Sequence, residues 1–461
     1  MRFLCQILLT PVLLFGAVTP PDTPAGKVFA KWLDAFNSGD RGRLVAYAEQ
    51  YDPKLAAEPD RFLQFRENTG GFDLLRISKS EARLITGLVK ERKSDTVAEF
   101  EFRLEGDDDH LKVVGMRVQQ VPPPPEFAPA RLSLKELPAA VDRHIAERTQ
   151  TGLSGAVLVS RNGEVVVAKS FGLADREKNK AATLDTQFRL GSMNKMFTSV
   201  AILQLVQKGK LDLNAPLGKY LKDYPNQNVA SKVTIQHLLT HTGGTGDIFG
   251  PEFNRKRLEL KTLSDYVTLY GNREPEFEPG SQFRYSNYGY LLLGAIIEAV
   301  AGQSYYDYVR ENIFKPAGMN RTDSLPETEV VSDRAVGYMR RDGKLVPNTD
   351  TLPWRGTSAG GGYSTVRDLH KFATALLNGT LLKKETLAEA TRPHKNNYGY
   401  GFSIQAGPGR PVSWGHGGGA PGMNGELRVF PDSGWIVVAL SNLDPPAAGQ
   451  LADFIALRLP L

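Results

Sequence analysis

The sequence predicts an α+β protein of two unlike domains. Three observations support this: helical spacing followed by strand alternation near the N-terminus, a run of prolines, and two hairpins at opposite ends of the remaining chain. The predicted boundaries are residues 25–121, a proline-rich linker at 122–131, and a larger domain at 132–461. With 461 residues, of which 41% are hydrophobic and 23% charged, the chain has a globular composition.

Residues 1–19 are predicted to be a secretory signal peptide. Arg2 precedes a mostly apolar run, Phe3 to Val18, that is too short to span a bilayer. A buried N-terminal helix is the alternative interpretation. Removal of this segment would also remove Cys5, the one cysteine, and no other segment is long and apolar enough for a stable membrane span. We therefore expect a periplasmic or secreted bacterial protein.

The first domain begins with apolar residues at helical spacing across 27–49, interrupted by a turn at 37–40. Strand patterns follow at 82–90, 96–104 and 110–121. The acidic turn 105–109 is interpreted as a solvated hairpin tip and not as a metal site. Helices followed by a curved antiparallel sheet resemble the cone-shaped fold of nuclear transport factor 2. That resemblance implies a pocket, although no catalytic cluster is evident here.

Four consecutive prolines at 122–125 exclude a helix or a central strand and predict a stiff extended spacer. Beyond it, the pattern predicts helices and hairpin strands near both ends of the large domain, with a largely helical middle. The predicted ranges are helix 134–148, strands 155–160 and 164–169, strands 426–430 and 435–440, and helix 447–457. This order predicts an antiparallel sheet flanked by terminal helices, with a helical subdomain inserted.

A serine and a lysine three residues apart open a predicted helix that runs to about Lys208. This spacing places Ser192 and Lys195 on one face, one turn apart. A serine hydroxyl needs a nearby base to become a nucleophile, and an amine can serve if burial lowers its pKa. The N–H groups at the helix start are suited to stabilising an oxyanion. The alternative is a capping serine followed by a surface lysine.

A second motif, Tyr285-Ser286-Asn287, precedes an apolar helix predicted from Tyr290 to Ala301. Side chains two residues apart in an extended segment point the same way. A phenol near a cationic lysine loses its proton more readily, and an amide can both donate to a substrate carbonyl and accept from an amine. An ordinary turn with a helix cap is the alternative.

The third motif is His416-Gly417-Gly418-Gly419, which follows an apolar strand. Successive glycines allow another backbone to approach closely, so this edge is suited to binding an extended substrate. The Gly419 N–H would then be an oxyanion donor. A flexible loop is the alternative.

In this order and with this wide spacing, the three motifs resemble the serine β-lactamase-like family, which includes class C β-lactamases, penicillin-binding proteins, D-aminopeptidases and esterases. The resemblance covers residues 132–461. It implies that Ser192 is acylated, that Lys195 is its base or orienting partner, and that Tyr285 relays the proton. It also implies substrate binding by Asn287 and by residues 416–419, with the N–H groups of Ser192 and Gly419 forming the oxyanion hole.

His416 stands where β-lactamases carry a lysine that binds the substrate carboxylate. A histidine is mostly neutral at pH 7 and holds a carboxylate less firmly, although Arg428 could compensate. We therefore expect a serine hydrolase acting on small esters, amides or D-amino-acid peptides. The alternatives are a penicillin-binding DD-peptidase or β-lactamase, and a catalytically silent protein that binds peptidoglycan fragments.

Other chemistries have weaker support. His237 and His241 have the i, i+4 spacing of zinc ligands, but the stretch lacks the glutamate of a zinc protease and matches a loop of the resembled family. No G-x-S-x-G, phosphate-loop or dinucleotide motif is present. We expect no metal and no cofactor.

The net charge of +5 is spread along the chain, which argues against nucleic-acid binding. The expected partner is a small-molecule or peptide substrate, and protein partners stay unassigned.

Overall fold

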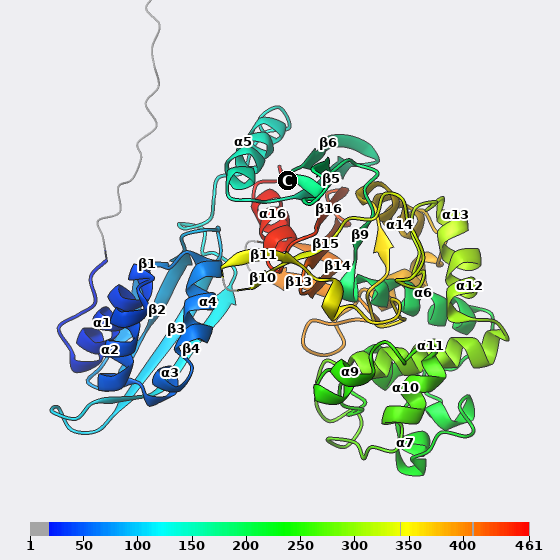
Figure 1. Cartoon of the computed structure of the whole chain (residues 1–461), viewed down its shortest axis with the longest axis horizontal. Helices are drawn as coiled ribbons and strands as arrows, with labels where there is room; N and C mark the ends of the chain where they lie inside the picture. The colour runs from blue at the N-terminus through cyan, green and yellow to red at the C-terminus, as the bar shows by residue number, and fades with distance from the viewer. Residues whose placement is uncertain (1–17, 342, 408–409, 461) are drawn as a thin grey trace, which may run out of the picture. The chain divides into compact units, whose positions relative to one another are not determined.

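The computed structural model describes residues 18–341, 343–407 and 410–460. The predicted signal peptide therefore lies almost entirely outside the described residues. The chain divides into two compact units, with the boundary between Pro129 and Ala130 (Figure 1). Within the described ranges, no helix has the length and apolar character needed to cross a membrane.

The N-terminal unit packs four helices against a four-stranded antiparallel sheet of order β1-β2-β3-β4 (Figure 1). Its elements are α1 Pro24–Ser38, α2 Arg41–Tyr51, α3 Pro53–Ala57, α4 Pro59–Thr69, β1 Phe72–Ser80, β2 Leu84–Glu91, β3 Val97–Glu105 and β4 Lys112–Val121.

Aromatic packing joins α1 to the sheet. The Thr23 side chain caps α1, and Gly39 ends it in the left-handed conformation at φ 67°, which glycine adopts without strain. The rings of Phe29 and Phe100 stack with centroids 4.3 Å apart. The predicted pair of helices and three strands are present, whereas α3, α4 and β1 were not predicted.

The proline-rich linker contains a turn. The backbone N–H of Phe127 donates to the Pro124 carbonyl at 2.9 Å, and Glu126 pairs with Arg76 of β1 at 3.0 Å. The prediction of a fully extended spacer is therefore wrong for residues 125–127, because the residues after the fourth proline fold back.

The larger unit is built on a six-stranded antiparallel sheet of order β13-β14-β15-β16-β5-β6. Its strands and flanking helices are α5 Leu137–Gln150, β5 Gly155–Arg161, β6 Glu164–Phe171, β13 Ser403–Gly407, β14 Arg410–Ala420, β15 Met423–Phe430, β16 Trp435–Ser441 and α16 Ala447–Ala456. Strand β16 lies between β15 and β5, which confirms that both ends of this unit build one sheet. Asn162 and Gly163, with φ 50° and 86°, form the predicted tight turn between β5 and β6.

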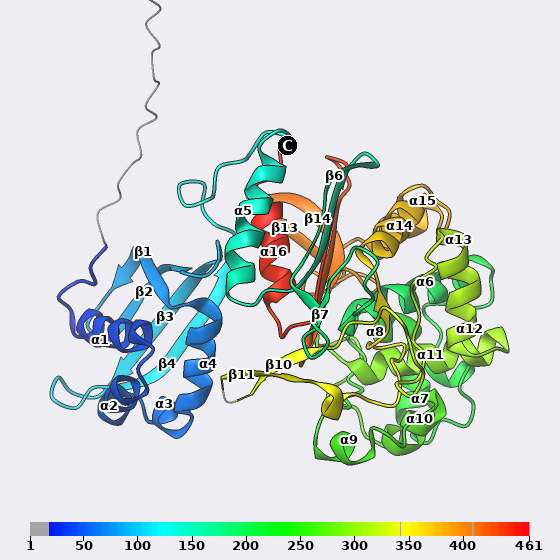
Figure 2. The ribbon, with the colours of Figure 1, turned by 45° about the horizontal axis from the view of Figure 1, so that its top comes forward.

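The two faces of this sheet have different covers. Helices α5 and α16 lie on one face, and the helical subdomain lies on the other (Figure 2). Alternate residues of β5 divide between them: Val157 and Val159 pack with the terminal helices, whereas Ala156 and Leu158 face the subdomain. The predicted α+β class, with a flanked antiparallel sheet and an inserted helical subdomain, is confirmed.

The subdomain and its connections contain the remaining elements. Its helices are α6 Asn194–Gln207, α7 Gln227–Lys232, α8 Ile235–Leu239, α9 Pro251–Lys256, α10 Leu263–Tyr270, α11 Asn287–Ala301, α12 Tyr305–Val309, α13 Lys315–Ala317, α14 Val366–Leu377 and α15 Lys384–Ala390. The short strands are β7 Leu173–Asp175, β8 Lys180–Ala181, β9 Phe188–Arg189, β10 Tyr338–Arg341, β11 Lys344–Pro347 and β12 Tyr363–Ser364. Helix α6 is buried on nearly every face, so the side chains that it contributes are held in fixed positions.

Candidate active site

Ser192 and Lys195 lie together at the start of α6, as their spacing predicts. Ser192 is in a 3₁₀ turn, Gly191–Met193, that continues directly into α6. Lys195 Nζ is 3.2 Å from Ser192 Oγ. Because the turn and the helix are both packed in the core, the serine and the amine are positioned before any ligand binds.

Lys195 is fully buried and has three polar partners. Besides Ser192, its Nζ donates to Asn287 Oδ1 at 2.7 Å and to the Ala359 carbonyl at 2.6 Å. These two oxygens can only accept, so a neutral amine gives them its two protons and points its lone pair at the Ser192 hydroxyl. Burial lowers the pKa of Lys195 to about 7, against the opposing effect of the Asp247 charge. The amine is therefore suited to receiving a proton from Ser192 near neutral pH.

Tyr285 lies beside this pair. Its ring centroid is 4.7 Å from Lys195 Nζ, and burial raises the pKa of Tyr285, while a hydrogen bond with Ser192 acts in the opposite direction. The expectation of a phenol that readily loses its proton is therefore wrong for this structure, because burial outweighs the neighbouring groups. Tyr285 is positioned as a neutral hydroxyl in contact with Ser192.

Asn287 is the first residue of α11, three residues earlier than the predicted helix start, and Ser286 caps that helix. While its Oδ1 faces Lys195, its Nδ2 donates to Asp247 Oδ2 at 3.2 Å. Its backbone N–H donates to Asp247 Oδ1 at 3.1 Å. Sequence reasoning missed Asp247, which follows the His241 loop and belongs to no recognisable motif.

The glycines of β14 pack against backbone atoms of neighbouring segments of the chain. Strand β14 pairs with β15 through Gly417, Gly418 and Gly419, so the flexible-loop alternative is wrong. A Cβ on Gly418 would lie 1.8 Å from the Leu190 carbonyl oxygen, and a Cβ on Gly191 would lie 2.8 Å from the Gly419 nitrogen. The turn that contains Ser192 therefore packs directly against the backbone of β14, with no side chain between them. The Gly419 nitrogen lies next to this turn.

Replacing Gly418 with alanine is expected to displace the Ser192 turn, because a methyl group cannot fit 1.8 Å from a carbonyl oxygen. Overpacking of this kind costs about 1–3 kcal/mol, and a catalytic group misplaced by 1 Å can lose roughly 100-fold in rate. Thermal unfolding and labelling of the serine by a fluorophosphonate should both report the change. The matched control is Gly449→Ala on α16, where an added Cβ meets nothing within 4 Å. Unchanged labelling in Gly418→Ala would contradict this account of the turn.

His416 has protein partners on both ring nitrogens. Nδ1 contacts the Gly417 carbonyl, so it carries the proton, and Nε2 accepts from the Tyr398 hydroxyl at 2.9 Å. Burial and the nearby Lys195 charge lower the pKa of His416 to about 4. The ring is therefore neutral near pH 7 and engaged by the protein on both nitrogens, and its role in substrate binding stays a prediction. Tyr398, which sequence reasoning missed, holds the ring in place.

The histidines of the 237–241 stretch are not arranged as a helical metal pair. His241 lies beyond the end of α8 with φ 57°, and its Nδ1 accepts from the Ser286 N–H at 3.1 Å. His237 caps the start of α8 through its own Nδ1, which accepts from the Thr234 N–H at 3.3 Å. Each ring thus supports local backbone, and the centroid of the His241 ring lies 4.2 Å from that of Tyr285, with the two ring planes tilted by 37°.

Arg428 points away from the serine. It is buried beneath α16, where it pairs with Glu426 at 3.0 Å and with Asp453 at 2.7 Å. Strand alternation explains this, because His416 pairs with Leu427 and the next residue faces the opposite side of the sheet. The expectation that Arg428 replaces the missing lysine is therefore wrong.

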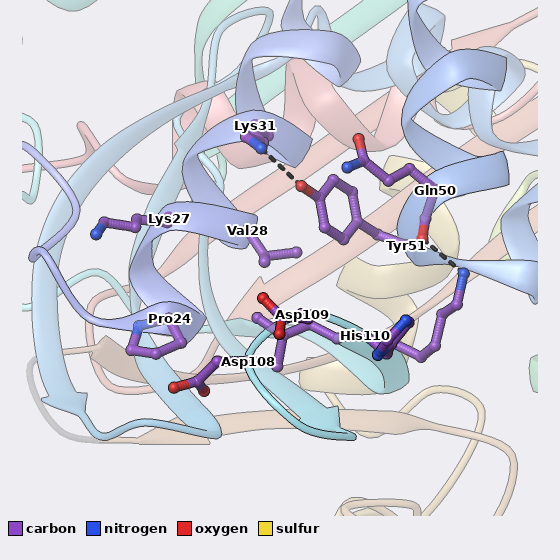
Figure 3. A pocket seen from close by; sticks show the side chains of 11 residues that line it. Pro24, Lys27, Val28, Lys31, Gln50, Tyr51, Asp108, Asp109 and His110 are labelled. Carbon is purple, nitrogen blue, oxygen red and sulfur yellow. Dashed lines mark hydrogen bonds between the residues drawn. The ribbon is translucent and has the colours of Figure 1, made fainter.

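The N-terminal unit has a pocket of its own, of about 470 Å³ (Figure 3). It lies between α1, the end of α2 and the tip that joins β3 to β4. Lys31 Nζ donates to the Tyr51 hydroxyl at 2.6 Å, and Lys112 Nζ donates to the Gln50 carbonyl at 2.6 Å. Its lining residues include no serine, threonine or cysteine, so the pocket holds no serine-type nucleophile.

Residues 141–459 match the family model described as Beta-lactamase. The chain belongs to the β-lactamase family. Penicillin-binding protein 4* of Bacillus subtilis (strain 168) is 32% identical over 312 residues, which are 63% of this chain and 68% of that protein. The matched residues begin at 141, so the likeness of the N-terminal unit to nuclear transport factor 2 stays a prediction.

Solved structures agree with this assignment. The penicillin-binding protein from Bacillus halodurans has a TM-score of 0.62 at 32% identity and covers 70% of this chain and all of that one. A D-stereospecific amidohydrolase from Streptomyces sp. has a TM-score of 0.59 at 28% identity, covering 69% of this chain and 98% of that one. These relatives place the larger unit in a family of serine hydrolases.

Proposed function

We propose that this protein is a serine hydrolase that works through an acyl-enzyme on Ser192. The carrying observation is the buried Lys195 amine, whose two acceptor-only partners leave its lone pair for the Ser192 hydroxyl 3.2 Å away. In acylation, Lys195 takes the hydroxyl proton as Ser192 Oγ attacks the substrate carbonyl carbon. The N–H groups of Ser192 and Gly419 stabilise the oxyanion of the tetrahedral intermediate.

Breakdown of this intermediate requires a proton for the leaving group. Lys195, now an ammonium, returns the proton through Tyr285, whose hydroxyl contacts Ser192. In deacylation the same groups work in reverse and remove a proton from the attacking water. The second Nδ2 proton of Asn287 is left to hold a substrate carbonyl, because Asp247 uses the first.

We infer that the substrates are small esters, amides or D-amino-acid peptides. The ring of His416 is neutral and engaged on both nitrogens, and Arg428 faces α16, so neither supplies a cation for a substrate carboxylate. This weighs against a dedicated β-lactamase or a peptidase that requires a free C-terminal carboxylate. The likeness to the D-stereospecific amidohydrolase supports an amide substrate. With residues 1–19 as a signal, we propose that the protein acts outside the cytoplasm.

A covalent probe tests this function directly. A fluorophosphonate should add to the intact protein once, and peptide mapping should place the adduct on Ser192. A turnover screen with p-nitrophenyl esters, D-amino-acid anilides and nitrocefin should then show hydrolysis of the first two classes above nitrocefin. Absence of the Ser192 adduct would overturn the proposal, and labelling without turnover of any class would instead support a silent binding protein.

A further inference from the structure

Asp247 lies behind the Ser192–Lys195 pair, in contact with Asn287. Its Oδ1 accepts from the backbone N–H of Asn287 and of Ile248, at 3.1 and 2.8 Å, and its Oδ2 accepts from Asn287 Nδ2 at 3.2 Å. Building on the proposed function, we propose that Asp247 is a positioning residue: its carboxylate orients the Asn287 amide toward Lys195 and stabilises Lys195 once it has taken the Ser192 proton.

The orientation of the amide follows from the hydrogen-bonding capacity of its neighbours. A carboxylate can only accept, so the NH₂ group of Asn287 must face Asp247 and the amide oxygen must face Lys195. With an amide at 247, one of these acceptors becomes a donor. Asn287 can then rotate and turn its own NH₂ toward the amine. Lys195 would lose an acceptor that fixes the direction of its lone pair.

The charge of Asp247 acts on a site whose other groups are neutral. The titratable side chains that interact with Lys195 are Tyr285, Tyr290, His241 and His416, and Tyr398 adjoins the two tyrosines. Burial raises the pKa of each tyrosine and lowers the pKa of both histidines, so none carries charge near neutral pH. The Asp247 charge raises the pKa of Lys195 against the effect of burial.

These effects give the sign of the expected change. Without the carboxylate, the ammonium form of Lys195 is less stable, so Lys195 loses its proton at lower pH. In Asp247→Asn, the pH midpoint of Ser192 labelling by a fluorophosphonate should move down by about one unit. Above that midpoint the rate should fall roughly 10-fold to 100-fold, because the amine is no longer held toward the hydroxyl. A residue that merely supported the fold would lower the rate without moving the midpoint.

The experiment compares wild type, Asp247→Asn, Asp247→Glu and Glu259→Gln from pH 5 to 9. Asp247→Glu keeps the charge and should return the midpoint toward wild type. Glu259→Gln is the matched control, because it removes the same charge at an exposed position and should leave midpoint and rate unchanged. If Asp247→Asn does not fold, Asp247→Ser takes its place, since a hydroxyl can still accept from a backbone N–H.

A second measurement separates this proposal from the proposed function. In protein labelled with [¹³Cε]lysine, the NMR titration of Lys195, assigned with Lys195→Met, should show the same downward shift in Asp247→Asn. An unchanged Lys195 titration in a folded Asp247→Asn protein overturns the role of Asp247, whether or not the enzyme is active. Absence of a Ser192 adduct in wild type overturns the hydrolase function, while the titration still decides the role of Asp247.

Discussion

Replacing Ser192 with alanine is expected to abolish covalent labelling and to lower turnover by at least about 10⁴-fold. The substitution removes the one oxygen that lies 3.2 Å from Lys195 Nζ and contacts Tyr285, so no acyl-enzyme can form. The fold should be kept, because the Ser192 side chain is half-buried and the turn is held by its glycine backbone contacts. Intact-mass analysis after fluorophosphonate treatment and initial rates on the best substrate measure the two effects.

Ser160→Ala is a suitable control for this experiment. Ser160 is fully buried on β5 and its hydroxyl lies 2.7 Å from His370 Nε2, so it is another serine beside a base. Its burial closes it to substrate, and we expect full labelling and turnover in that variant. Residual labelling in Ser192→Ala that disappears in the double variant would assign the chemistry to Ser160 and would contradict our assignment.

Replacing Lys195 with methionine should lower the labelling rate by about 10²–10⁴-fold, the usual contribution of a general base. In wild type the rate should rise with pH through about 7, because the ammonium present below that pH cannot accept the Ser192 proton and the amine above it can. Lys195→Met should have no such rise. Labelling reactions stopped at timed intervals across this pH range measure both the fall in the labelling rate and the absence of its rise with pH.

The stability of this variant is a separate readout. Methionine fills a similar volume but leaves Asn287 Oδ1 and the Ala359 carbonyl without their donor, at roughly 1–3 kcal/mol for each buried group. Lys208→Met, at the exposed end of the same helix, should change neither the rate nor its pH dependence. A rate in Lys195→Met within a few-fold of wild type would exclude the amine as the base.

Local spacing was enough to predict the parts of this protein whose geometry is set within a few residues. The three-residue separation of Ser192 and Lys195 places them on one helix face, and Asn162-Gly163 forms the turn of a hairpin. The continuous apolar runs of β5 and β16 likewise indicate strands covered on both faces, because successive side chains of a strand point to opposite faces of the sheet. The confirmed fold class follows from these local signals and from their order along the chain.

Contacts between distant segments were not predictable in the same way. Asp247 contacts Asn287 across 40 residues, and Tyr398 contacts His416 across 18 residues. Neither Asp247 nor Tyr398 belongs to a recognisable motif. The pKa of Tyr285 was expected to follow the lysine beside it, whereas burial by surrounding segments decides it. Strand β1 was missed because much of it is exposed, so its sequence lacks a clear apolar alternation.

The position of β16 in the sheet has a consequence for biosynthesis. This strand follows all the other strands of its sheet along the chain, yet it lies between β15 and the β5–β6 hairpin, which is made first. Until it emerges, β5 has an open edge and its apolar side chains lack their cover, a state that invites aggregation. The sheet of this unit therefore cannot close until β16 has been synthesised, and the apolar strands made before it need protection until then.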